Sequence, residues 1–148
     1  HIVVNLTGQP DSEALRTFVS HCDKLLFYTD QNVLDCRRNL DVLSVWRTKG
    51  MKLEHAGLLV DRYLRGVAPD ADALAKSFGL PVLATLPASP ELRINAKNQA
   101  VTLFELGPRE PLSLGLKKLG ERLALRSQLP GQSQGKSESW LNRLWGSK

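Results

Sequence analysis

Short apolar runs that end abruptly in polar residues recur along this chain, and segments with helical periodicity separate them. The first run, Ile2-Val3-Val4, ends in Asn5-Leu6-Thr7-Gly8. A continuous apolar run, as opposed to an alternating one, is typical of a strand buried on both faces of a parallel sheet. The four predicted strands cover residues 2–8, 24–29, 56–63 and 82–86. This pattern predicts an α/β fold, with a mostly parallel sheet flanked by helices on both faces.

Helix-starting and helix-ending residues fill the intervals between these runs. Asp11 or Ser12 can cap the first helix, and Pro90 stands at the first turn of the fourth. Gly50 and Gly79 follow the second and third helical segments, where glycine is a common C-terminal stop. The predicted helices cover about 12–21, 33–49, 70–78, 89–98 and 111–126, with a short apolar patch at 101–106.

The length and termini of the sequence suggest one domain cut from a longer protein. A chain of 148 residues can bury a single core. No apolar run approaches the ~20 residues that span a bilayer. The sequence opens at His1, directly on a predicted strand and without an initiator Met, so we expect a piece of a longer protein.

The net charge of +5 is concentrated at the C-terminal end. From Arg126 onward the chain carries a net charge of +3, which leaves only +2 on the body. We therefore do not expect nucleic acid as a partner. Cys22 and Cys36 are expected to be reduced thiols, and the scattered histidines suggest neither a metal site nor a catalytic triad.

Two short segments follow the predicted domain, which covers residues 1–126. Residues 127–137 are polar and rich in Ser, Gln and Gly, which predicts a flexible linker. Residues 138–148 form a short amphipathic tail, in which Trp140, Leu141, Leu144 and Trp145 share one helical face. This face fits an interfacial membrane anchor or a partner-docking helix. A frayed tail is the other interpretation, because isolated helices below ~12 residues are marginal in water.

The predicted strand ends are the candidate site, because ligands of open α/β sheets bind beyond the carboxyl ends of the strands. No phosphate-binding motif of the GxxxxGK[ST] or GxGxxG type occurs in the sequence. What remains is a row of polar turns at 5–8, 30–32, 61–62 and 87–89. Taken alone, these residues fit ordinary polar turns equally well.

The order of these segments resembles the C-terminal half of the ParA/MinD superfamily of P-loop ATPases, and more narrowly the TadZ/CpaE proteins of Tad (Flp) pilus systems. Residues 2–8 resemble the family strand that ends in Asp-Leu-Pro, and 58–62 resemble the strand that ends in Asn-Arg. The other similar segments are 22–29, 35–40, 78–89 and 95–103. The resemblance implies a three-layer P-loop NTPase-like domain whose N-terminal P-loop part is absent from this chain.

The resemblance also implies a nucleotide-binding site, and this sequence departs from it at important positions. The residues implied to bind the cofactor are Asn5, Thr7, Gly8, Asp61, Arg62, Pro87 and Ser89. Asn5 replaces the Asp that would organise Mg²⁺, and an amide lacks the anionic charge that a hard cation prefers. Asp61 replaces the base-contacting Asn and lacks its amide donors. Gln99 stands where the family has Gly. We therefore expect no catalytic residue and no metal ligand in this chain.

These departures favour a scaffold protein over an active ATPase. The resemblance implies an ATPase-like scaffold and localisation protein for pilus or secretion-system assembly, cytoplasmic and associated with the inner membrane or the cell pole. Its implied partners are a second copy, other assembly proteins and, through the tail, the membrane surface. ATP or ADP with Mg²⁺ is implied only for a full-length form, and tight binding to this chain alone is not expected. The alternatives are a fragment of an active ParA/MinD-type ATPase and a partitioning or regulatory protein.

Overall fold

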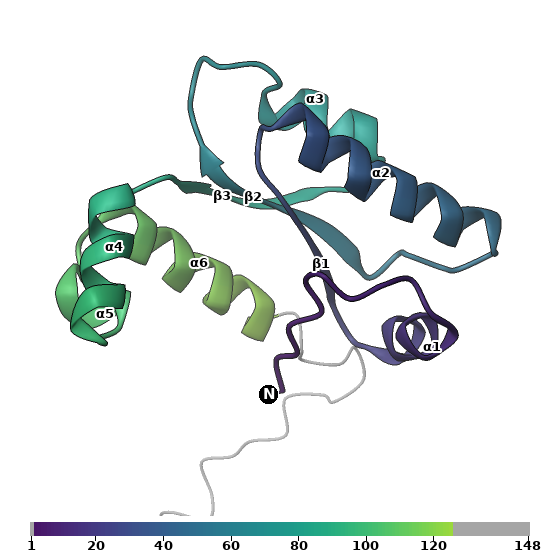
Figure 1. Cartoon of the computed structure of the whole chain (residues 1–148), viewed down its shortest axis with the longest axis horizontal. Helices are drawn as coiled ribbons and strands as arrows, with labels where there is room; N and C mark the ends of the chain where they lie inside the picture. The colour runs from purple at the N-terminus through teal and green to yellow at the C-terminus, as the bar shows by residue number, and fades with distance from the viewer. Residues whose placement is uncertain (1, 126–148) are drawn as a thin grey trace, which may run out of the picture.

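A parallel three-stranded sheet forms the centre of the domain in the computed structural model, which describes residues 2–125 (Figure 1). Strands β1 (Leu25–Thr29), β2 (Ala56–Tyr63) and β3 (Val82–Pro87) lie in the order β1-β2-β3. Leu25 pairs with Ala56, and Leu58 pairs with Val82. The predicted α/β class, with a parallel sheet between layers of helices, is confirmed.

Helices occupy the predicted intervals, and their ends carry the expected capping residues. The Oγ of Ser12 accepts a hydrogen bond from the Leu15 amide, so Ser12 rather than Asp11 is the first N-cap. Gly79 ends the third helix in the left-handed conformation. The helices are α1 (Glu13–His21), α2 (Val33–Thr48), α3 (Ala71–Phe78), α4 (Pro90–Gln99), α5 (Leu103–Leu106) and α6 (Pro111–Leu125). The apolar patch at 101–106 therefore contains a short helix, which begins with a capping box of Thr102 and Glu105.

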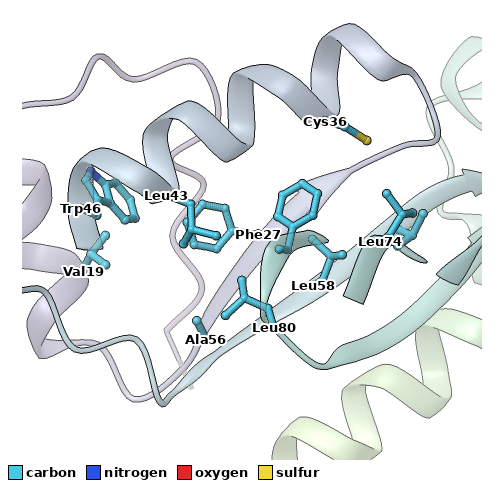
Figure 2. Packing of buried hydrophobic residues seen from close by; sticks show 11 residues of the cluster. Val19, Phe27, Cys36, Leu43, Trp46, Ala56, Leu58, Leu74 and Leu80 are labelled. Carbon is cyan, nitrogen blue, oxygen red and sulfur yellow. The ribbon is translucent and has the colours of Figure 1, made fainter. Parts of the chain in front are cut away.

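The larger of two hydrophobic clusters lies on the face of the sheet that α2 and α3 cover (Figure 1). Phe27 of β1 packs against Trp46 of α2, with ring centroids 5.5 Å apart. Leu58 of β2 and Leu43 of α2 lie in the same layer (Figure 2), and α1 adds Val19 to it. Aromatic and aliphatic burial of this kind supplies most of the stability of a small domain.

A second hydrophobic cluster lies on the opposite face, between the sheet and α6. Leu112 and Leu119 of α6 pack there with Leu59 of β2 and Leu86 of β3. Since Leu58 and Leu59 face opposite layers, β2 is buried on both sides. This two-sided burial explains why the sequence of β2 is a continuous apolar run.

The predicted first strand is wrong. Residues 2–6 have no regular secondary structure, and the side chains of Ile2 and Val3 are each 94% exposed. A strand needs a neighbour that supplies ladder hydrogen bonds, and within residues 2–125 the sheet contains β1, β2 and β3 alone. The Thr7-Gly8 turn is present, and Leu6 packs against the larger cluster.

The predicted linker at 127–137 and tail at 138–148 lie outside the described residues, as does Arg126. No helix of the described part is both long enough and apolar enough to cross a bilayer.

Replacing Leu58 with Ala is expected to lower the free energy of unfolding by about 3 kcal/mol, because the cavity would lie in a fully buried layer. Chemical denaturation of the Leu58→Ala variant measures this loss. Leu34→Ala is the matched control, since that side chain is 66% exposed and its removal should change stability by less than about 0.5 kcal/mol. Equal losses in the two variants would contradict the burial of β2.

Candidate functional site at the carboxyl ends of the strands

The three strands end at one edge of the sheet, where α2 and α4 begin (Figure 1). Asp61 and Arg62 lie near the carboxyl end of β2, and Pro87 is the last residue of β3. The pairing register shifts between Val60 and Tyr63, and Arg62 has a positive φ of 50°. This irregularity interrupts the alternation of side chains between the two faces of β2. As a result Tyr63 packs against the larger cluster, as Val60 does.

Asp61 is a buried carboxylate with a partner on each oxygen. Only 1% of the residue is exposed. The Tyr28 hydroxyl of β1 donates to Oδ2 at 2.5 Å, and the Arg93 guanidinium of α4 donates to Oδ1 at the same distance. A buried charge is tolerated when it is paired and hydrogen-bonded, as it is here. The Asp61 carboxylate therefore joins β1, β2 and α4.

Arg93 also fastens the loop between β3 and α4. Its Nε donates to the carbonyl oxygen of Ala88 at 2.7 Å, and its Nη2 lies 3.4 Å from that of Pro87. A planar guanidinium can serve several acceptors with little loss of rotamer entropy. One side chain thus holds the β3–α4 loop against the end of β2.

The Tyr28 hydroxyl is held in its protonated form. Burial raises the pKa of Tyr28, and the hydrogen bond to the negative Asp61 raises it further, to about 12. An ionised phenol would face the carboxylate at hydrogen-bond distance. Tyr28 is therefore a hydrogen-bond donor at neutral pH.

Gln31 positions the loop between β2 and α3. Its Oε1 accepts from the Leu64 amide at 2.7 Å, and its Nε2 donates to the carbonyl oxygens of Val67 and Pro69 at 2.7 and 2.9 Å. Beside it, Asn32 caps α2 by accepting from the Leu34 amide. The β1 end therefore organises both the next helix and the next loop.

The segment that contains Asn5, Thr7 and Gly8 is held by a different set of contacts. Asn5 Oδ1 accepts from the Thr7 amide at 3.0 Å, which forms a local turn. Within the described residues, no hydrogen bond or ion pair joins this turn to the ends of β2 or β3. The predicted role of these three residues in nucleotide binding stays a prediction.

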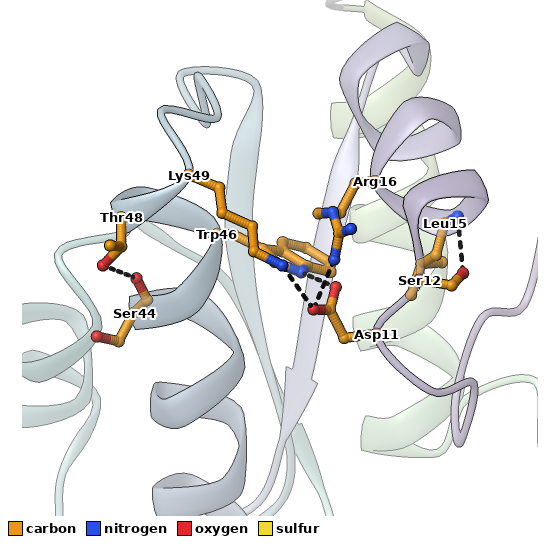
Figure 3. Close-up of polar contacts among 8 residues, drawn as sticks. All are labelled: Asp11, Ser12, Leu15, Arg16, Ser44, Trp46, Thr48 and Lys49. Carbon is orange, nitrogen blue, oxygen red and sulfur yellow. Dashed lines mark hydrogen bonds and ion pairs between the residues drawn. The ribbon is translucent and has the colours of Figure 1, made fainter.

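Asp11 attaches this N-terminal segment to the last turn of α2 (Figure 3). Its carboxylate accepts from Trp46 Nε1 at 2.9 Å and from Arg16 Nη1 at 2.7 Å, and Lys49 Nζ lies 3.5 Å away. The hydrogen bond from Trp46 is the main reason that the pKa of Asp11 is lowered. Because α2 begins at the carboxyl edge of the sheet, this attachment lies about 20 Å along the helix from that edge.

The structure thus places Asp61, Arg62, Pro87 and Ser89 of the predicted set at one edge of the sheet. Asn5 and Thr7 are joined to each other in a separate turn, which continues into Gly8. Sequence reasoning missed Tyr28 and Arg93, and it included Gln31 only as part of the polar turn at 30–32, with no role of its own. Arg93 lies between the similar segments 78–89 and 95–103, and a helical Arg carries no signal of its partner on a strand 32 residues earlier. In residues 2–125 no group of three or more His, Cys, Asp or Glu side chains could hold a metal ion.

Solved structures of MinD and ParA ATPases share this fold. The chain is 18% identical to a MinC:MinD cell division protein complex from Aquifex aeolicus, with 84% of this chain and 51% of that chain covered and a TM-score of 0.63. For a ParA family ATPase from Chlorobium tepidum the values are 15% identity, 76% and 46% coverage, and a TM-score of 0.64. The cell division ATPase MinD of Pyrococcus furiosus is 19% identical, with 71% of this chain and 44% of that chain covered and a TM-score of 0.57.

These similarities establish the fold at low sequence identity. The chain spans about half the length of the structures that it matches. No protein-family model matches the sequence, and no curated protein matches it either. The domain therefore has a MinD/ParA-like, P-loop NTPase-type architecture, as the sequence resemblance predicted.

Replacing Arg93 with Met is expected to lower the free energy of unfolding by about 3 kcal/mol, because Asp61 would be left buried without its cation. The double variant Asp61→Asn with Arg93→Met removes the orphaned charge and should recover part of this loss. Urea denaturation of both variants measures the difference. A double variant less stable than Arg93→Met alone would contradict the charge-pairing role of Arg93.

Stability is expected to fall as the pH rises from 10 toward 12. The unfolded chain loses the Tyr28 proton near pH 10, whereas the folded chain retains it to about 12, so ionisation favours unfolding in this interval. Spectrophotometric titration follows tyrosinate in a protein with two tyrosines, and subtraction of the Tyr28→Phe titration isolates Tyr28. A Tyr28 midpoint near 10 would show that Asp61 does not hold the hydroxyl.

Proposed function

We propose that this chain is part of a ParA/MinD-type scaffold, with a degenerate nucleotide site, that positions a Tad (Flp) pilus or related secretion apparatus in the manner of TadZ/CpaE proteins. The observation that carries the proposal is the engagement of Asp61. Its two carboxylate oxygens bind Tyr28 and Arg93 inside the protein. The residue at the implied base-contacting position therefore serves to hold the strand ends together.

The donor set also fits a Mg²⁺-nucleotide poorly. Asn5 offers an amide, and its side-chain oxygen already accepts from Thr7. Mg²⁺ prefers carboxylate oxygens and nearly ideal octahedral geometry, to which a neutral amide contributes little. Arg62 and Ser89, which have positive φ values, remain the candidate contacts to a nucleotide in a full-length form.

The runner-up is a fragment of an active ParA/MinD-type ATPase. It is favoured by the coverage, because the chain spans about half of structures that are described as ATPases. A partitioning or regulatory role is the third candidate, and the body charge of only +2 weighs against binding to DNA.

Three partners belong to the proposal. A second copy would meet the chain along the carboxyl edge, and other assembly proteins would bind the resulting dimer. One similar structure is a complex of MinD with MinC, so this fold supports protein partners. Residues 138–148 would bring the assembly to the inner membrane or the pole through Trp140, Leu141, Leu144 and Trp145.

The full-length protein is expected to show no Mg²⁺-dependent ATP hydrolysis above a protein-free blank. Asn5 lacks the carboxylate that would organise Mg²⁺, and Asp61 lacks the amide donors that would contact the base. Phosphate release is measured beside an active ParA/MinD-type ATPase, and a fluorescent ATP analogue reports binding separately. Turnover comparable to that of the active enzyme would reject the scaffold in favour of the runner-up. The Asn5→Asp variant controls for the amide, since a return of Mg²⁺-dependent binding would identify that position as the deficient one.

A further inference from the structure

A groove of about 350 Å³ lies beside the β3–α4 loop, between the start of α4 and the turn that joins α5 to α6. Its size is in the range of sites that hold a large side chain or a small ligand. Leu92 and Leu106 provide apolar surface, and Ser89 and Asn95 provide uncharged polar groups. A Cβ atom on Gly107 would come within 2.7 Å of Leu92 and Glu110, so the glycine permits the close packing of this wall.

The charge of the groove is negative. Glu91 and Glu110 both line it, and no Lys, Arg or His is among the described residues that do. Both glutamates are exposed, so their carboxylates are accessible to a ligand in the groove. An occupant that combines cations with large apolar side chains would complement this surface.

Residues 138–148 have that combination. The sequence of this segment contains Trp140, Trp145 and two leucines, and Arg143 and Lys148 supply positive charge. The only acid of the segment is Glu138. Trp and Arg are the residues that most often anchor a binding interface, because one buries a large area and the other pairs with carboxylates.

The length of chain also suits this occupant. Glu110 lines the groove immediately before the first residue of α6, and the C-terminal segment leaves from the last residue of the same helix. The 15 residues of α6 separate these points by about 22 Å. A Ser/Gly-rich sequence of the length of 126–139 has a root-mean-square span of roughly 20 Å. The effective concentration of a tethered ligand is greatest when these two distances match.

We propose that the C-terminal segment 138–148 binds in the groove of its own domain, with Trp140 or Trp145 on the apolar wall and Arg143 beside Glu91 and Glu110. The docked segment covers the β3–α4 loop, which Arg93 fastens to Asp61. The contact is intramolecular and requires no nucleotide, so its test is independent of the scaffold role.

Photo-cross-linking in the full chain tests the contact. A benzoylphenylalanine at position 145 is expected to cross-link to residues 89–95 or 106–110, with a yield that does not depend on protein concentration. Mass spectrometry maps the cross-linked peptides. Cross-links to another part of the body, cross-links between two chains, or no cross-links at all would each overturn the proposal.

Charge reversal tests the specificity of the contact. Glu91→Lys with Glu110→Lys should lower the cross-linking yield at least about threefold, since exposed ion pairs are individually weak and both are lost. Arg143→Glu in that background should restore part of the yield. Glu13→Lys with Glu121→Lys is the matched control, because Glu13 also lies in the first turn of its helix and both residues are exposed. An equal loss in the control, or no rescue, would overturn the assignment of the charges.

Discussion

The buried carboxylate of Asp61 is the constraint on which the carboxyl edge depends. It is the one charged residue of the described part that is buried, and a carboxylate in that position must be paired. Tyr28 and Arg93 satisfy it from β1 and α4, and Arg93 in turn holds the β3–α4 loop. The contacts that neutralise this one charge therefore hold the ends of β1 and β2 and the β3–α4 loop together.

Most of the fold could be predicted from the sequence, because its information is local. The continuous apolar run of β2 follows from burial between α2 and α6, and Gly79 stops α3 where its left-handed backbone is needed. The run at 2–4 has the same local pattern without a neighbour in the described sheet, so the same rule failed there. Periodicity measures the tendency to be buried, whereas pairing depends on residues elsewhere in the chain.

The site was less predictable, because its contacts join residues that are far apart in sequence. The strand-end rule located Asp61 and Pro87 correctly at one edge. It did not indicate that Asp61 faces a Tyr 33 residues earlier and an Arg 32 residues later. Gln31 is a similar case, since an amide after a strand gives no sign in the sequence that it positions a loop more than 30 residues away. The pairing of β2 with β1 on one side and with β3 on the other makes these pairs neighbours.

The edge and the acidic groove share the β3–α4 loop, and this connects the two proposals physically. Arg93 binds the carbonyl oxygens of Pro87 and Ala88, and Ser89 lines the groove one residue later. A ligand that moved Arg93 would release the carbonyl oxygens that precede Ser89, and would thereby affect the wall on which the C-terminal segment would dock. By linkage, the docked segment would change the affinity of the edge for that ligand by the same factor. Under both proposals, a ligand at the edge would control the docking of the C-terminal segment without being hydrolysed, because such control needs only a difference in binding free energy between two arrangements of the loop.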